Sequence, residues 1–264
     1  MAIKICIVGA GGRMGKNIAT IIHNDKDCEV YAGIDKSGSE AINQPIFEYS
    51  NCGKGGVLIS DNIFSAKGAD VIIDFTGSKV TMANIDNYKS LGIALVVGST
   101  GFTAEEKTSL ISISKDIPLL LAPNMSLGVN VMFKLAALAA KSLKGYDIEI
   151  VETHHKMKKD APSGTAMGIA EAVSKATNIN LSENAVYARH GIIGERKENE
   201  IGIQTLRGGD VVGDHTLYFF GNGERIEITH RAHTRATFAE GAVTAAKWLY
   251  NKSSGFYTME DVLF

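Results

Sequence analysis

The segment IKICIVGAGGRMGKNIATIIHN, residues 3–24, indicates the fold class of the first half of the chain. Its first six residues form a largely apolar run, which is typical of a strand buried on both faces in a parallel sheet. Four residues, GAGG, follow this run, and from Arg13 onward apolar residues recur at helical spacing. A strand, a glycine turn and a helix in this order predict the first unit of a parallel α/β sheet.

Short apolar runs continue this pattern through the first half of the chain. They are EVYAGID (29–35), GVLIS (56–60), ADVIIDFT (69–76), IALVVGST (93–100) and IPLLLAP (117–123). Stretches with helical spacing, 79–91 and 104–115, lie between the later runs. This alternation predicts a doubly wound, Rossmann-type parallel sheet, and we assign residues 1–125 to a dinucleotide-binding domain.

The second half has a different pattern. A long apolar helix is predicted over 129–143, then a strand over 146–153 and a second helix over 163–176. Three later runs, EIGIQTLRGGD (200–210), HTLYFF (215–220) and RIEITH (225–230), look like antiparallel strands, and Asn-Gly between the last two indicates a tight hairpin. We predict an α+β substrate-binding domain with a mixed or antiparallel sheet at 126–235, and a C-terminal segment, 236–264, that begins with a helix.

Composition excludes several classes of protein. The 264 residues are 45% apolar and 21% charged with a formal net charge of -2, so nucleic acid is a poor candidate partner and small molecules are favoured. The three cysteines lack CxxC spacing, which argues against a disulfide framework or zinc site and fits reduced thiols in the cytoplasm. No apolar run is long enough for a membrane span, and the first residues are interpreted as a strand, not a signal peptide.

The glycine turn has the features of a cofactor-binding loop. Gly9, Gly11 and Gly15 suit a tight turn and a close approach to a phosphate, which the start of the following helix attracts. Asp35, twenty residues beyond Gly15, can accept hydrogen bonds from ribose hydroxyls and therefore favours NADH. The adjacent Lys36 could attract a 2′-phosphate, which leaves NADPH open as well.

Three further turns follow predicted strands at their carboxyl ends. They are FTGS (75–78), GSTG (98–101) and APNMS (122–126). Ligands bind at this edge of open α/β sheets, so these turns are predicted to form the wall on the nicotinamide side.

The segment HHKMKKDAPSGTA, residues 154–166, collects proton donors and cations. Ser163 is a natural N-cap, so the backbone N–H groups around Gly164 and Thr165 should point outward and attract a carboxylate. The nearby lysines, Lys156, Lys158 and Lys159, add positive charge. A histidine is the usual proton source when a hydride is delivered to a double bond, whereas adjacent histidines point different ways on a strand and do not form a metal site.

With these residues in view, the chain resembles the dihydrodipicolinate reductases, also called 4-hydroxy-tetrahydrodipicolinate reductases. The resemblance covers nearly the whole length of the chain. It rests on the segments VGAGGRMG, DFT, GSTG, APNMSLGVN, ETHHKMKKDAPSGTA, RGGDVVGDHTLYF and HRAHTRATFAEGAV. The HH…K.DAPSGTA pattern is specific to this family, whereas the glycine turn is shared with many dehydrogenases. The resemblance implies an NAD(P)H-dependent enzyme of lysine and diaminopimelate biosynthesis that reduces a cyclic dicarboxylate to tetrahydrodipicolinate.

The resemblance also implies roles for individual residues. The expected catalytic residues are His154, as the proton donor, and Lys158; the expected substrate-binding residues are His155, Gly164, Thr165 and Arg235. The expected cofactor-binding residues are Gly9, Ala10, Gly11, Gly12, Arg13, Met14, Asp35, Lys36, Gly98, Ser99, Thr100, Ala122, Pro123, Asn124 and Met125. Family members are usually homotetramers built through the second domain, their last helix returns to the dinucleotide-binding domain, and no metal is implied.

Two positions depart from the pattern common in the family, and two other functions stay open. Many relatives have a basic residue where Met157 stands and a threonine where Ser99 stands. One alternative is a two-domain oxidoreductase acting on another small amino or keto acid. The other is a non-catalytic redox sensor that binds NADH, although no basic DNA-binding module is visible.

Overall fold

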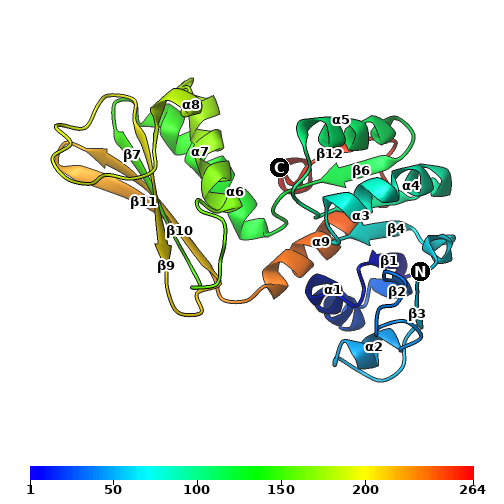
Figure 1. Cartoon of the computed structure of the whole chain (residues 1–264). Helices are drawn as coiled ribbons and strands as arrows, with labels where there is room; N and C mark the ends of the chain where they lie inside the picture. Colours follow the sequence, from blue (N-terminus) through cyan, green and yellow to red (C-terminus); the bar gives the residue numbers. More distant parts are fainter. The chain divides into compact units, whose positions relative to one another are not determined.

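A computed structural model describes all residues, 1–264, and divides the chain into two compact units (Figure 1). Unit 1 comprises Met1–Leu127 and Arg235–Phe264, and unit 2 comprises Gly128–Thr234. The divisions lie within two residues of the limits expected from the sequence. The C-terminal segment belongs to unit 1, where its helix packs against the first helix of the chain.

Unit 1 contains a seven-stranded parallel sheet, so the predicted Rossmann-type architecture is confirmed. The strand order is β12-β6-β5-β4-β1-β2-β3. The strands are β1 (Ile3–Val8), β2 (Cys28–Ile34), β3 (Ile59–Ser60), β4 (Val71–Asp74), β5 (Ala94–Val97), β6 (Pro118–Leu121) and β12 (Gly255–Tyr257). The order reverses direction at β1, which lies between β2 and β4, and ligands of such sheets bind at this switch point.

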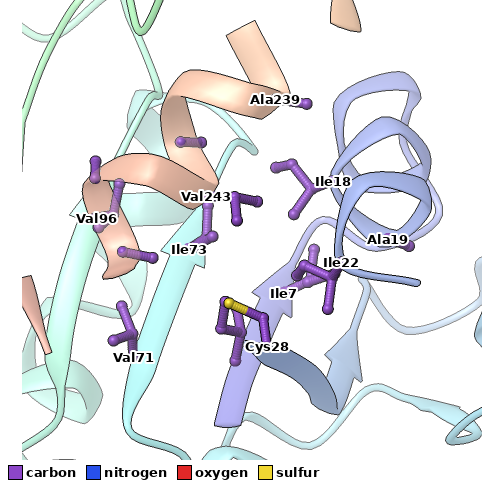
Figure 2. Close-up of a cluster of buried hydrophobic side chains, with 14 of the residues drawn as sticks. Ile7, Ile18, Ala19, Ile22, Cys28, Val71, Ile73, Val96, Ala239 and Val243 are labelled. Atoms are coloured by element: carbon purple, nitrogen blue, oxygen red, sulfur yellow. The ribbon is translucent and has the colours of Figure 1, made fainter. Parts of the chain in front are cut away.

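Helices cover both faces of this sheet. They are α1 (Arg13–His23), α2 (Ile46–Tyr49), α3 (Ser78–Ala83), α4 (Ile85–Leu91), α5 (Ala104–Ser112), α9 (Ala236–Leu249) and α10 (Met259–Leu263), with 3₁₀ turns at Ile63–Ala66 and Ile113–Lys115. On one face, Ile18 and Ile22 of α1 and Val243 of α9 join the buried side chains of β1 and β4 (Figure 2). On the other face, Tyr88 and Leu110 from α4 and α5 are fully buried.

Some elements of unit 1 differ from the sequence prediction. The helix expected over 79–91 is split at Asn84 into α3 and α4. The strand expected over 56–60 is only Ile59–Ser60, because the backbone has positive φ at Gly55 and Gly56 and is irregular there. The edge strand β12 was not predicted, since its three residues are too few to show a periodic pattern.

Unit 2 is an α+β unit with a mixed five-stranded sheet in the order β11-β10-β7-β9-β8. Its strands are β7 (Asp147–His154), β8 (Ala185–Val186), β9 (Ile201–Arg207), β10 (Gly213–Gly221) and β11 (Glu224–Ala232), and its helices are α6 (Leu127–Ser142), α7 (Gly164–Thr177) and α8 (Leu181–Asn184). The predicted Asn-Gly hairpin is confirmed, because Gly221 pairs with Glu224 across a two-residue turn in which Gly223 has φ +86.

One strand direction in unit 2 was predicted wrongly. β9 is parallel to β7 and to β8, not antiparallel. From the end of β7 the chain crosses through α7 and α8 back to the side of the sheet where β7 began, and both β8 and β9 then run in the direction of β7. Crossovers of this kind join parallel strands. In the resulting register, Thr205 lies beside Glu152 and Arg207 lies beside His154.

Candidate active site

The turn after β1 is shaped to receive an anion. Gly9 has φ +83, and a Cβ on Gly15 would lie 2.2 Å from the carbonyl oxygen of Gly9, so both positions require glycine. The N-cap of α1 is Gly12, which has no side chain to cap the helix. The first N–H groups of α1, including those of Arg13 and Met14, have no acceptor within the helix and are available to a phosphate.

A pocket of about 440 Å³ opens beside this turn, entirely within unit 1. Of the predicted cofactor residues, Gly9, Gly12, Asp35 and Lys36 line it. The sequence analysis did not single out the pocket-lining residues Ser37, Asp61, Ile63, Val80 and Asn84. Asp35 Oδ2 accepts a hydrogen bond from Gly11 N at 2.6 Å, and Lys36 is exposed. The pocket therefore joins the glycine turn to the end of β2, as an adenosine-binding groove requires.

The turns after β4 and β5 are held together by a buried carboxylate. Asp74, the fully buried last residue of β4, accepts hydrogen bonds from Tyr88, Thr76 and Ser99. The Ser99 hydroxyl also accepts from Gly77 N at 2.9 Å and from Thr81. The side chain of Ser99 is thus committed inside the protein, and only its backbone can contact a cofactor.

The remaining predicted cofactor residues lie at the carboxyl ends of β5 and β6. Thr100 and Pro123 are exposed, Gly98 and Asn124 are half-buried, and Ala122 and Met125 are buried. The side chain of Met125 is part of the hydrophobic core of unit 1. These two short turns present mostly backbone atoms. They are therefore better suited to packing against a planar ring than to recognising a ligand through side chains.

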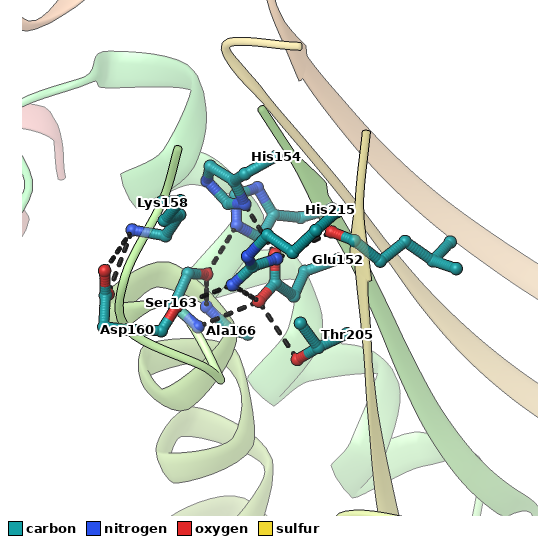
Figure 3. Close-up of polar contacts among 10 residues, drawn as sticks. Glu152, His154, Lys158, Asp160, Ser163, Ala166, Thr205 and His215 are labelled. Atoms are coloured by element: carbon teal, nitrogen blue, oxygen red, sulfur yellow. Dashed lines mark hydrogen bonds and ion pairs between the residues drawn. The ribbon is translucent and has the colours of Figure 1, made fainter. Parts of the chain in front are cut away.

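In unit 2, the inward face of β7 changes from apolar to ionisable along the strand. Ile148, Ile150, Glu152 and His154 alternate along β7 and are all buried. Residues two apart on a strand share a face, so Glu152 and His154 are neighbours. The distance between Glu152 Oε2 and His154 Nδ1 is 2.5 Å (Figure 3).

Glu152 is fully buried and, besides His154 on its own strand, has partners on two other segments. Arg207 of β9 donates to both carboxylate oxygens, at 2.8 and 2.9 Å. Ser163 N donates to Oε1 at 3.0 Å, and Thr205 donates to the same oxygen at 3.1 Å. Burial raises the pKa of Glu152, but the hydrogen bonds from Arg207 and His154 outweigh burial, so the net pKa lies below its usual range.

The two histidines of this cluster are held in the neutral form in the free protein. Burial lowers the pKa of His154, and the raising effect of Glu152 does not compensate, because Lys158 and Arg207 also face the ring. His215 of β10 lies edge-on to His154, with ring centroids 5.1 Å apart. Burial, together with the nearby His154, lowers the pKa of His215 to about 3.

The start of α7 adjoins these rings. Ser163 caps the helix by accepting from Ala166 N at 3.2 Å, and its hydroxyl also lies 3.0 Å from His215 Nε2. Gly164 is exposed and Thr165 is half-buried, so the first turn of α7 is accessible. A carboxylate bound there would meet backbone N–H groups and the positive end of the helix.

Lys158 and His155 lie on the turn between β7 and α7. Lys158 Nζ contacts both carboxylate oxygens of Asp160, at 2.9 and 3.0 Å, and its side chain is 20% exposed. His155 is half-buried, with its backbone N–H bonded to Val211 O. Arg235, in contrast, belongs to unit 1, where it is the N-cap of α9. The structure therefore brings His154, His155, Lys158, Gly164 and Thr165 together on unit 2 and places Arg235 on unit 1. The roles expected for all six residues stay predictions.

The sequence analysis missed Glu152, Arg207 and His215. A signal for Glu152 exists, because it occupies an inward position two residues before His154 and two after the apolar Ile150. Arg207 and His215 lie in the segment RGGDVVGDHTLYF on which the family resemblance rests, but no spacing in the sequence indicates a role for either residue. Their positions depend on the strand order, which places β9 and β10 on either side of β7.

The unit 1 sheet, with its uncapped glycine turn at the switch point, defines a Rossmann-type dinucleotide-binding fold. Family models described as "Dihydrodipicolinate reductase, N-terminus" and "Dihydrodipicolinate reductase, C-terminus" match residues 3–125 and 128–263. The chain belongs to the dihydrodipicolinate reductase family.

Individual relatives agree with this assignment. The chain is 48% identical to a 4-hydroxy-tetrahydrodipicolinate reductase of Geotalea uraniireducens over 263 residues, covering 99% of this chain and 98% of the relative. It is 47% identical to that of Geobacter sulfurreducens, covering 98% of both. A solved dihydrodipicolinate reductase from Paenisporosarcina sp. TG-14, with dipicolinate bound, has the same fold, with a TM-score of 0.78, 23% identity and 98% coverage of both chains.

The structure also bears on metals and membranes. It contains no group of three or more His, Cys, Asp and Glu side chains arranged to hold a metal ion. None of its helices combines the length and the apolar character that crossing a bilayer requires.

The neutral state of His215 predicts a pH-dependent stability. The unfolded chain takes up a proton on this histidine below a pKa of about 6.5, whereas the folded protein does not until about pH 3. Unfolding therefore absorbs a proton in this window, and the free energy of unfolding falls by up to about 1.4 kcal/mol per pH unit as the pH is lowered. Replacing His215→Asn should flatten the dependence by up to about one proton between about pH 6 and pH 4.

Urea unfolding followed by circular dichroism at several pH values, on both proteins, measures this difference. The titration of carboxylates is common to both proteins and cancels in the comparison. Parallel pH dependences in the two proteins would show that His215 is not held neutral.

Proposed function

We propose that this protein is an NAD(P)H-dependent 4-hydroxy-tetrahydrodipicolinate reductase, which forms tetrahydrodipicolinate in the diaminopimelate route to lysine. The observation that carries the proposal is the buried His154 beside the accessible start of α7, in a chain matched by both halves of this family. A histidine and a helix N-terminus together suit protonation of a substrate that carries carboxylates.

Unit 2 supplies the groups that bind the substrate. The first N–H groups of α7, at Gly164 and Thr165, receive one carboxylate, and His155 makes a further polar contact. Lys158 exchanges its contact with Asp160 for a substrate carboxylate. This exchange requires little free energy because the Asp160 side chain is 62% exposed, and exposed ion pairs contribute little to stability. The substrate contact that the family resemblance implies for Arg235, a residue of unit 1, stays a prediction.

Unit 1 holds the cofactor, and the fit is favourable. The glycine positions that a Cβ would fill, the uncapped start of α1 and the pocket beside Asp35 suit the pyrophosphate and adenosine of NAD(P)H. When bound, NAD(P)H supplies a hydride. The backbone at Gly98–Thr100 and Ala122–Met125 orients the nicotinamide.

His154 supplies the proton that balances the hydride. In the free protein its ring is neutral, and a bound substrate with two carboxylates favours the imidazolium, so proton uptake accompanies substrate binding. If the substrate is the dihydro form, its ring gains one hydride and one proton. If the substrate is the 4-hydroxy form, it also loses one molecule of water. The neutral His154 is then reprotonated from solvent. Lys158 contributes electrostatic stabilisation beside the carboxylate.

The direct test is a coupled assay. The synthase that precedes this step generates the substrate from pyruvate and aspartate semialdehyde, and consumption of NADH or NADPH is followed. We expect oxidation that depends on the synthase, with His154→Gln and Lys158→Ala each lowering kcat by about 10²-fold or more and leaving cofactor affinity unchanged.

An exposed lysine of the same turn provides the control, since Lys159→Ala should change kcat little. Folded, NADH-binding protein that oxidises neither cofactor in this assay would exclude the proposed reaction. Activity with simple amino acids and NAD would instead indicate an amino-acid dehydrogenase, and binding without any turnover would indicate a redox sensor.

We propose that the protein uses both NADH and NADPH, with NADH favoured by Asp35. The Asp35 carboxylate is fixed by Gly11 N and Lys36 N and lies beside the ribose position, where it repels a 2′-phosphate. The exposed Lys36 offsets part of this repulsion.

Replacing Lys36→Ala should therefore raise KM for NADPH about 5-fold, equivalent to ~1 kcal/mol for an exposed charge pair, and should change KM for NADH much less. Lys26→Ala, an exposed lysine just before β2 at the opposite edge of the sheet, is the control. Equal changes in both KM values would exclude a contact between Lys36 and the 2′-phosphate.

We further propose that the protein works in the cytoplasm as a homotetramer assembled through the sheet of unit 2. All three cysteines are free, and burial raises the pKa of Cys28 to about 11, so this thiol is unreactive.

In unit 2, α7 packs on one face of the sheet. Tyr218 and the partly exposed Phe220 project together from β10 and stack with centroids 5.6 Å apart.

Light scattering coupled to size-exclusion chromatography should give a mass four times the 28.2 kDa of the chain. Replacing Phe220→Lys would place a charge in the proposed interface, so it should shift the mass towards smaller species. A monomeric wild-type protein at assay concentration would exclude the tetramer.

A further inference from the structure

Glu152 is an unusual residue for the centre of a sheet. It is fully buried on the central strand β7, and carboxylates are seldom buried completely unless they are paired. Its two oxygens accept hydrogen bonds from four other residues, Arg207, Thr205, Ser163 and His154. Burying a carboxylate is unfavourable because the charge loses its hydration. Glu152 is therefore retained either for structure alone or because one of its partners depends on the carboxylate for its function.

The contact with His154 limits which proton the ring can carry. Arg207 donates to both oxygens of Glu152 and keeps the carboxylate ionised. An ionised carboxylate only accepts hydrogen bonds, so His154 Nδ1 must be the donor. The neutral ring therefore carries its hydrogen on Nδ1, and the lone pair is on Nε2.

The surroundings of Nε2 are consistent with a nitrogen that must stay accessible. Gly213 of β10 lies beside this nitrogen, since a Cβ there would lie 2.9 Å from Nε2. Glycine at this position leaves room beside the nitrogen. Nδ1 is enclosed by the carboxylate, so only Nε2 can exchange a proton with a ligand.

We propose that Glu152, held by Arg207, is a positioning residue for His154: it fixes the ring and its tautomer, so that Nε2 takes up and delivers the proton. Glu152 also stabilises the imidazolium once the substrate has bound. The charged and titratable groups that face His154 are Glu152, Lys158, Arg207 and His215, and Glu152 is the one anion among them. The inference rests on the proposed function.

The strand β7 offers a matched control for the structural part of this role. Glu149 lies on the same strand and is 17% exposed. It accepts two hydrogen bonds from Arg189, at 2.8 and 2.9 Å, as Glu152 does from Arg207. No histidine contacts Glu149 in this pairing. Glu149→Gln therefore removes a similar Glu–Arg pair without touching the proton donor.

The test compares Glu152→Gln with Glu149→Gln and the wild type in the coupled assay, from about pH 6 to pH 9. Both variants should lose stability. Only Glu152→Gln should lose kcat, by about 10²-fold or more at neutral pH, with a change in substrate KM of less than about 3-fold.

The pH profile separates positioning from a general structural defect. Removing the anion lowers the pKa of the His154 imidazolium, and the acid form is the one that donates. The decline of kcat at high pH should therefore move to lower pH in Glu152→Gln, so lowering the pH partly restores activity. A structural defect would reduce kcat by the same factor at every pH.

If Glu152→Gln does not fold, Glu152→Asp carries the same test. It keeps the charge but withdraws it from Nδ1, so kcat should fall, though less than in His154→Gln, and the decline of kcat at high pH should again move to lower pH. Wild-type kcat in a folded Glu152 variant, or a loss that is independent of pH, would overturn the inference. An inactive wild-type protein would instead mean that the proposed function has failed.

Discussion

The buried carboxylate of Glu152 is the constraint on which the organisation of unit 2 depends. A charge placed in the interior must be paired and fully hydrogen-bonded, since an unpaired one costs several kcal/mol. Satisfying it requires Arg207 and Thr205 from β9, the backbone N–H of Ser163 before α7, and the ring of His154. One side chain thus links the parallel neighbour of β7, the start of the helix and the proposed proton donor.

The two units prepare anion sites in related but distinct ways. Both place the N-terminus of a helix directly after a turn that follows a strand. In unit 1 the N-cap is Gly12, so the start of α1 stays open for the diffuse charge of a pyrophosphate. In unit 2 the N-cap Ser163 occupies one N–H with its own oxygen, which leaves a smaller site beside His154 that suits a carboxylate. The difference between glycine and serine at the cap therefore matches the ligand proposed for each unit.

Local sequence patterns predicted the elements that depend on interactions between residues close together in the chain. The apolar runs, the glycine turn and the Asn-Gly hairpin identified the Rossmann-type sheet and the β10–β11 pair, because each depends on residues close together in the chain. Asp35 was found by its spacing from the glycines, and it lines the pocket beside them. The family resemblance added the expected roles of His154 and Lys158, which local patterns alone would have left as a cationic loop.

The parts that could not be predicted depend on long-range register. Arg207 is 55 residues from Glu152, and its role follows only from the parallel pairing of β9 with β7, which the sequence analysis took as antiparallel. Ser99 was expected to face the cofactor, but its hydroxyl is buried against Asp74, 25 residues away. In both cases the decisive partner lies on another strand, and no spacing in the sequence reports it.

The proposed path of the proton depends most directly on which nitrogen of His154 carries the hydrogen in the free protein. Two-bond ¹H–¹⁵N correlation spectra of the histidine rings, at about pH 8 where the imidazole is neutral, identify the tautomer. His154→Gln assigns the signal by its disappearance. We expect hydrogen on Nδ1 and none on Nε2. Hydrogen on Nε2 would mean that Glu152 does not hold the ring as described, and it would contradict the proposed path of the proton.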